Sequence, residues 1–162
     1  MRRDIAGKIK STKIEKGQSL MELAVSMILL LILLAGIFDL GRAAIAYFIL
    51  QESAEEGIVY GIAFPTDCNQ ITMRIRNGIE HTIVTSPVTV SIMIENNAGT
   101  YTACYTIPYA QVYANKKMTI SISTDFPITM PFLGTILGRQ YIPLNVSTNG
   151  VILRPPEEAV SP

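Results

Sequence analysis

A long apolar run near the N-terminus constrains this 162-residue chain more than any other feature of its sequence. Residues 23–38 form sixteen consecutive positions without a charge, and Ser26 is the only strongly polar residue among them. As an α-helix this run spans about 24 Å, whereas the hydrocarbon core of a bilayer is ~30 Å thick. The run therefore needs further apolar sequence if it is to cross a membrane.

Apolar sequence resumes shortly after the run. Beyond Asp39 and Arg42, the stretch AAIAYFIL at residues 43–50 is apolar again. We predict one helix over residues 19–60 that crosses the bilayer and continues as a stalk. Along the stalk, apolar residues recur at steps of three and four and predict one helical face, made of Tyr47, Leu50, Ala54 and Ile58.

Charged residues are distributed unevenly about this helix. The net charge of the chain is zero, yet residues 1–17 hold six of its 13 Lys and Arg residues against two acidic residues. A basic segment before a membrane helix favours a cytoplasmic N-terminus, so we predict that the C-terminal part is exported. A cleaved secretory signal has a short apolar region and a small-residue cleavage site, so a retained anchor is the better interpretation. We expect no nucleic-acid binding, because the basic residues lie on a short tail.

The exported part, residues 63–162, changes from helical to alternating periodicity. Asp67 followed by Gln70 predicts a short helix that starts at Cys68 and ends near residue 78. Alternating β-branched and polar residues then predict strands, with a tight turn at the sequence NNAG. The strand segments are residues 88–94, 100–107, 118–124 and 144–153, the last broken at Asn149 and Gly150.

These patterns predict an α+β fold with three parts. A basic leader, residues 1–17, precedes a transmembrane and stalk helix at residues 18–62. A small antiparallel β-sheet domain of residues 63–162 follows, and it is large enough to bury one modest core.

The few cysteines and the single histidine limit the chemistry of the chain. Cys68 and Cys104 both lie in the exported part, where a pair of cysteines favours a disulfide, and two separate buried thiols are the alternative. A structural zinc site needs four Cys or His ligands. No nucleophile motif surrounds His81. We therefore expect no metal, no cofactor and no enzymatic activity.

Two further features each have two interpretations. The stretch FPITMPFLGTILG, residues 126–138, is apolar but broken by prolines. It is either a loop that covers the open face of the sheet or an exposed patch for a partner or the membrane interface. Asp39 and Arg42 are neighbours on the helix surface. They form either an interfacial pair or a polar face that packs against another helix in an assembly.

Glu22 lies in the first turn of the predicted helix. With Ser19 it matches the capping box, in which the serine accepts a backbone amide and the glutamate reaches back. A carboxylate there also suits the positive end of the helix dipole. Neither effect explains why Gly17 stands between the basic leader and the helix.

The order of a basic leader, Gly17, a hydrophobic helix and Glu22 at the fifth position after the glycine resembles the class III signal of type IV pilins and pseudopilins. Residues 16–63 resemble the N-terminal part of the TadE-like family, which are minor pseudopilins of the tight-adherence (Flp, type IVc) pilus. The matching elements are GQSLMELA, GIFDLGRA and QESAEEGIVYG. Residues 118–154 resemble the end of the same family: a strand, a proline-containing apolar turn and a closing strand.

The resemblance implies that a prepilin peptidase cuts between Gly17 and Gln18, and that Glu22 then pairs with a free α-amino group as subunits associate. It also implies a single-pass protein of the bacterial cytoplasmic membrane. Its partners would be the lipid bilayer, the prepilin peptidase, other pilins or pseudopilins and the pilus assembly platform. The alternative is an unprocessed, membrane-anchored binding or scaffold module in which Glu22 serves only as a cap.

Overall fold

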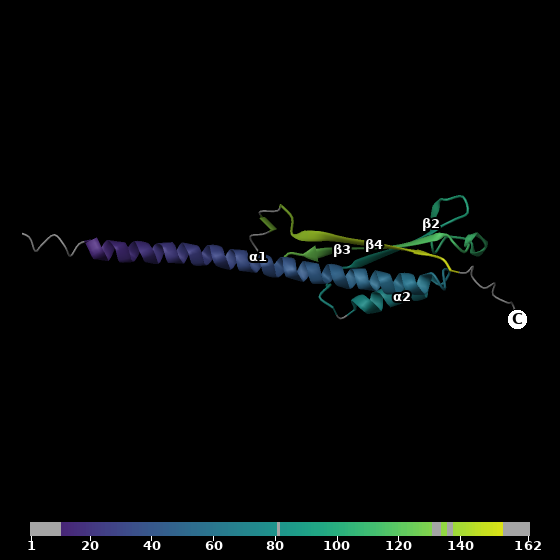
Figure 1. Ribbon diagram of the computed structural model, residues 1–162, viewed down its shortest axis with the longest axis horizontal. Helices are drawn as coiled ribbons and strands as arrows, with labels where there is room; N and C mark the ends of the chain where they lie inside the picture. The colour runs from purple at the N-terminus through teal and green to yellow at the C-terminus, as the bar shows by residue number, and fades with distance from the viewer. Residues whose placement is uncertain (1–10, 81, 131–133, 136–137, 154–162) are drawn as a thin grey trace, which may run out of the picture. The chain divides into compact units, whose positions relative to one another are not determined.

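The computed structural model describes residues 11–80, 82–130, 134–135 and 138–153 (Figure 1). It divides into two units, Met1–Leu40 and Gly41–Pro162. Helix α1 (Ser11–Gly61) contributes to both units. Helix α2 (Cys68–Ile79) and a four-stranded antiparallel sheet belong to the second. The predicted α+β class, a long N-terminal helix followed by a small antiparallel sheet, is confirmed.

Helix α1 begins upstream of the predicted start near residue 19. The segment STKIEKGQ, residues 11–18, contains Lys, Glu and Gln, which favour helix, and no proline that would end one. In the full-length chain Ser19 is therefore an interior helical residue. The capping-box interpretation of Ser19 and Glu22 is wrong for this form, because an N-cap must precede the first helical residue.

In the unit Gly41–Pro162, the stalk part of α1 buries one face, made of Ala43, Ala46, Leu50, Ala54 and Ile58. The predicted face is thus confirmed at its last three positions. Tyr47 is exposed, and the preceding Ala46 is buried in its place. Small side chains at the contact allow a helix to approach its neighbours closely. From the sequence, the stalk was grouped with the membrane helix as residues 18–62. In the structure, the stalk from Gly41 onward belongs to the compact unit.

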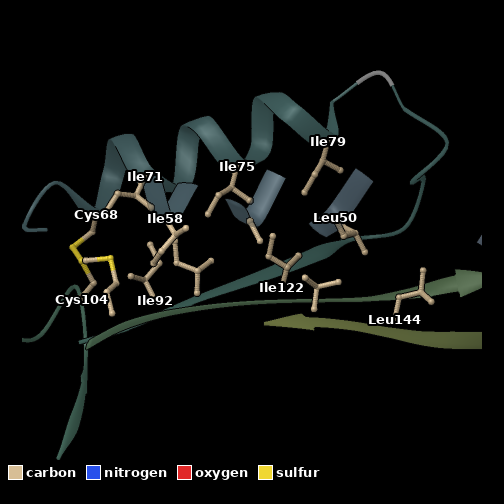
Figure 2. Close-up of a cluster of buried hydrophobic side chains, with 14 of the residues drawn as sticks. Leu50, Ile58, Cys68, Ile71, Ile75, Ile79, Ile92, Cys104, Ile122 and Leu144 are labelled. Atoms are coloured by element: carbon tan, nitrogen blue, oxygen red, sulfur yellow. A yellow bond between two sulfur atoms is a disulfide. The ribbon is translucent and has the colours of Figure 1, made fainter. Parts of the chain in front are cut away.

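Helix α2 begins at the predicted residue. The Asp67 side chain accepts a hydrogen bond from the backbone N–H of Gln70 at 3.2 Å and caps the helix. Its buried face points toward α1 and the sheet (Figure 2). That face consists of Cys68, Ile71, Ile75 and Ile79.

The sheet contains β1 (Val88–Glu95), β2 (Tyr101–Ala103), β3 (Lys117–Pro127) and β4 (Tyr141–Val151), in the order β2-β1-β3-β4. Strand β2 is shorter than predicted, because the N–H groups of Thr106 and Ile107 both donate to the Ala103 carbonyl, at 2.9 and 3.0 Å. These bonds turn the chain away from the sheet directly after Ala103.

Strand β4 runs unbroken through Asn149 and Gly150, so the predicted interruption there is wrong. A Cβ atom at Gly150 would lie 2.7 Å from Ile58 and 2.6 Å from Ile62. The glycine allows the sheet and the end of α1 to approach each other closely; it does not form a turn.

Within the compact unit, β4 runs in the same direction as α1. Near the start of the stalk, Arg42 contacts Thr129, just beyond the end of β3. At the other end, the backbone N–H of Leu153, just beyond β4, donates to the carbonyl of Ile62 at 3.0 Å. Since β3 and β1 are each antiparallel to a neighbour, β1 runs with α1 and β3 runs against it.

Candidate functional site: the helical segment and its anchor points

The residues predicted for processing lie on α1 in the unit Met1–Leu40. Gly17, Gln18, Ser19 and Glu22 are all helical and all exposed. A Cβ atom added at Gly17 would meet nothing within 4 Å. The fold therefore places no steric requirement for glycine at this position, although glycine weakens a helix by about 1 kcal/mol relative to alanine.

Glu22 is a carboxylate at the start of the apolar run, with Gln18, Ser19 and Ser26 as polar neighbours on its side of the helix. Leu20, Met21, Leu23 and Val25 beside it are at least half exposed. From residue 17 onward, among the side chains that the structure describes, none forms an ion pair with Glu22. A carboxylate in or near hydrocarbon is stable only when a cation or hydrogen-bond donors compensate it.

The apolar residues that follow are exposed along the helix. Gly17–Gly61 is long and apolar enough to be a candidate membrane span. Large side chains are exposed through the run, from Leu20 to Phe38. A contiguous apolar surface of this kind marks contact with lipid or with other proteins.

Asp39 and Arg42 occupy different environments. Asp39 is buried, which is rare for a carboxylate. The Arg42 side chain donates a hydrogen bond to the Thr129 hydroxyl, and its guanidinium lies 5.4 Å from the centroid of the Phe126 ring. That distance is within cation–π range. Arg42 therefore links the stalk to the end of β3, a role that sequence reasoning missed because nothing in the sequence relates residues 42 and 129.

A contribution of Asp39 and Arg42 to an assembly stays a prediction. The stretch 126–138 lies partly outside the described residues. Within its described part, Phe126 is buried in the core and Pro127 is exposed at the end of β3.

Cys68 and Cys104 form a disulfide, with Cα atoms 6.0 Å apart (Figure 2). The bond ties the start of α2 to the residue that follows β2. The sequence left two alternatives for these cysteines, a disulfide or two separate buried thiols, and the structure has the disulfide.

No group of three His, Cys, Asp or Glu side chains among the described residues is arranged to hold a metal ion. His81 lies outside those residues. The expectation that the chain is not an enzyme stays a prediction.

In a comparison with protein families, the model of the TadE-like protein family aligns with residues 17–58. No curated protein and no solved structure matches the chain. The aligned segment begins at Gly17, includes Glu22, Asp39 and Arg42, and ends within the stalk. The predicted likeness of residues 118–154 to the family's end lies outside the match and stays a prediction. Residues 17–58 are therefore similar to the TadE-like protein family, as the sequence predicts.

Proposed function

We propose that the chain is a membrane-anchored minor pseudopilin that takes part in assembly of a tight-adherence pilus or a related secretion apparatus. In this proposal the prepilin peptidase removes residues 1–17, helix α1 anchors the remainder, and the unit Gly41–Pro162 is exported. The observation that carries the proposal is the TadE-like match, which starts at Gly17 and spans the apolar helix.

The surroundings of Gly17 make a processing role testable. Because the fold leaves open space around this residue, a larger side chain there would not disturb the fold, so its effect would report an external requirement, such as fit into a peptidase. The same open space surrounds Gly36, in the same helix. Gly36 therefore provides a matched control position.

Processing would also provide a positive charge that compensates the negative charge of Glu22. Cleavage after Gly17 creates an α-amino group on Gln18, four residues before Glu22 and on the same side of the helix. A cation at that depth neutralises the carboxylate, either within the chain or on an adjacent subunit. The lipid-embedded end of the helix would then carry a paired charge in place of an isolated one.

The first experiment is an intact-mass measurement on chains extracted from host membranes that contain active prepilin peptidase. We expect a species that starts at Gln18. Gly17→Leu should leave the full-length chain, whereas Gly36→Leu should be cut as the unaltered chain is. A full-length unaltered chain would refute processing, and the chain would then be an unprocessed anchored binding or scaffold module.

A second variant tests the charge of Glu22 apart from cleavage. Glu22→Gln keeps the size of the side chain and removes its charge. We expect this variant to be inserted and cleaved normally but to be lost from pilus assemblies, while Glu22→Asp retains partial incorporation. Normal incorporation of Glu22→Gln would show that the charge of this residue has no role in assembly.

A further inference from the structure

The face of the sheet that points away from the helices has an unusual composition. Positions with even numbers in β1, β3 and β4 point toward α1 and α2, and positions with odd numbers form the open face. Their register places three rows of three residues side by side. The rows are Thr89–Ser123–Asn145, Ser91–Ser121–Ser147 and Met93–Thr119–Asn149. We call these nine positions the hydroxyl face.

The hydroxyl face has no charged residue, and Met93 is its one apolar member. Solvated sheet faces and edges ordinarily include charged side chains, which keep them soluble and prevent association. Charges occur on this side only outside the three rows, at Glu95, Lys117 and Asp125. Within the nine positions an ionic ligand would therefore find no counter-charge, and the apolar area is limited to Met93, with Ala103 opposite it in β2.

The polar groups of the face are held in place by one another. The Thr119 hydroxyl donates to the side-chain carbonyl of Asn149 at 2.8 Å, and the Ser121 and Ser147 hydroxyls lie 3.3 Å apart. Each hydroxyl or amide still has donor or acceptor capacity directed to solvent. The groups repeat about every 4.8 Å across the strands and about 6.7 Å along them.

A tyrosine lies at each of two margins of the face. Tyr101 pairs with Glu95 beside the last row, and its side chain is 47% exposed. Tyr141 pairs with Pro127 beyond the first row, and its side chain is 52% exposed. Tyrosine combines an apolar ring with a hydroxyl, which suits surfaces that are partly wet.

We propose that the hydroxyl face binds a neutral polysaccharide. Sugar rings present hydroxyl groups along their rims, which match a regular array of uncharged donors and acceptors. Their C–H faces stack on aromatic rings, which the marginal tyrosines provide. A protein partner would need an apolar centre for its interface, which this face lacks. The proposal is independent of processing at Gly17, because the purified chain suffices to test it.

The test uses the full chain in detergent micelles and a panel of soluble neutral glucans, mannans and galactans, with alginate as the anionic comparison. The chain contains seven tyrosines and no tryptophan, so the fluorescence change that Tyr101→Ala removes reports ligand contact at the margin of the face. We expect saturable binding of at least one neutral polymer that is insensitive to salt. Ser121→Arg, at the centre of the face, should weaken that binding at least tenfold.

Matched controls separate the face from general effects. Asn77→Arg places the same side chain on an exposed position of α2 and should leave affinity unchanged. Tyr101→Ala should weaken binding several-fold, while Tyr47→Ala, on exposed α1, should not. If Ser121→Arg does not fold, Ser147→Arg on the edge strand β4 replaces it.

Three results would overturn the proposal. The first is absence of binding to every neutral polymer in the panel. The second is binding that Ser121→Arg and Ser147→Arg leave intact. The third is binding of alginate alone, abolished by salt, which would indicate an ionic surface elsewhere on the chain.

Discussion

Gly57 offers a direct test of the packing between α1, α2 and the sheet. A Cβ atom at this position would lie 2.5 Å from Cγ1 of Ile75, 2.8 Å from its Cδ1 and 3.4 Å from Cδ1 of Ile120. Ile75 is fully buried, so any shift of its side chain moves it against other core residues. Gly57→Ala therefore overpacks the core, which costs about 1–3 kcal/mol.

The same substitution also gains helix propensity, so its net effect needs a reference. Alanine is better than glycine by about 1 kcal/mol in a helix, which leaves Gly57→Ala destabilising by about 0–2 kcal/mol. At Gly41, in the same helix, a Cβ atom meets nothing within 4 Å, so Gly41→Ala gains helix propensity without overpacking the core. The two variants should differ by about 1–3 kcal/mol, or roughly 4 °C in Tm for each kcal/mol.

Thermal unfolding of the full chain in detergent, followed by near-ultraviolet circular dichroism of the tyrosines, measures this difference. A double-mutant cycle then identifies its cause. Ile75→Ala alone should cost about 2–5 kcal/mol. In the double variant the methyl group of residue 57 enters the vacated space, so the two costs should fall short of additive by about 1 kcal/mol or more. Additive effects, together with equal Tm values for Gly57→Ala and Gly41→Ala, would refute the close approach.

Three further predictions follow from other contacts. Replacing Cys68 and Cys104 together by serine should lower the free energy of unfolding by about 4 kcal/mol on the chain-entropy model, measured by denaturant titration, since the bond closes a loop with a sequence separation of 36; a loss below about 1 kcal/mol would contradict that model. Asp67→Ala should cost about 1 kcal/mol through loss of the α2 cap, and Asp67→Asn much less, by the same titration; equal losses would exclude capping as the cause. Arg42→Ala should speed hydrogen exchange at the N–H of Ile128, which donates to the Gln140 carbonyl just beyond the end of β3, while exchange in β1 stays unchanged. Unchanged exchange at Ile128 would show that Arg42 does not hold this end of the sheet.

Local signals in the sequence predicted the helices and strands that depend on local chemistry. The N-cap at Asp67 and the alternation in β1 both act over a few residues, and both are found. The start of α1 was misplaced because two signals were present: Ser19 matches a cap, but the upstream residues are good helix formers. Without a helix breaker, propagation adds a bond for each residue, so the helix continues.

Long-range contacts explain what the sequence could not show. Gly150 follows an asparagine and has the local signature of a turn, yet it lies in a strand because the end of α1 packs on it. Pro127 belongs to β3 without cost, since β1 begins only at Val88, opposite Thr124, and no neighbouring strand residue pairs with Pro127 on that side. The contact of Arg42 with Thr129 likewise depends on the placement of the sheet along the stalk.

One of the two edges of the sheet is formed by β4 and the other by β2. The backbone N–H of Ile128 donates to the carbonyl of Gln140, and the N–H of Ile152 donates to the carbonyl of Lys116. The backbone N–H and C=O groups of even-numbered residues in β4 are therefore directed toward β3. The backbone groups of odd-numbered residues are therefore directed to the open edge, and Pro143 among these residues has no N–H group. At the far end the N–H of Leu153 is taken by Ile62. The longest run of N–H groups directed to this open edge is thus found at the odd-numbered residues of 145–151.

The shared direction of β4 and the stalk restricts how copies of this chain can meet at that edge. Antiparallel pairing of β4 with β4 requires a two-fold axis perpendicular to the sheet, which reverses both strand and stalk. If the chain is anchored as proposed, two stalks that leave the same membrane cannot be related in this way. The proposed anchor would then act as a symmetry constraint on this edge: strand pairing between anchored copies would be head-to-tail, the kind of contact that extends into rings or filaments.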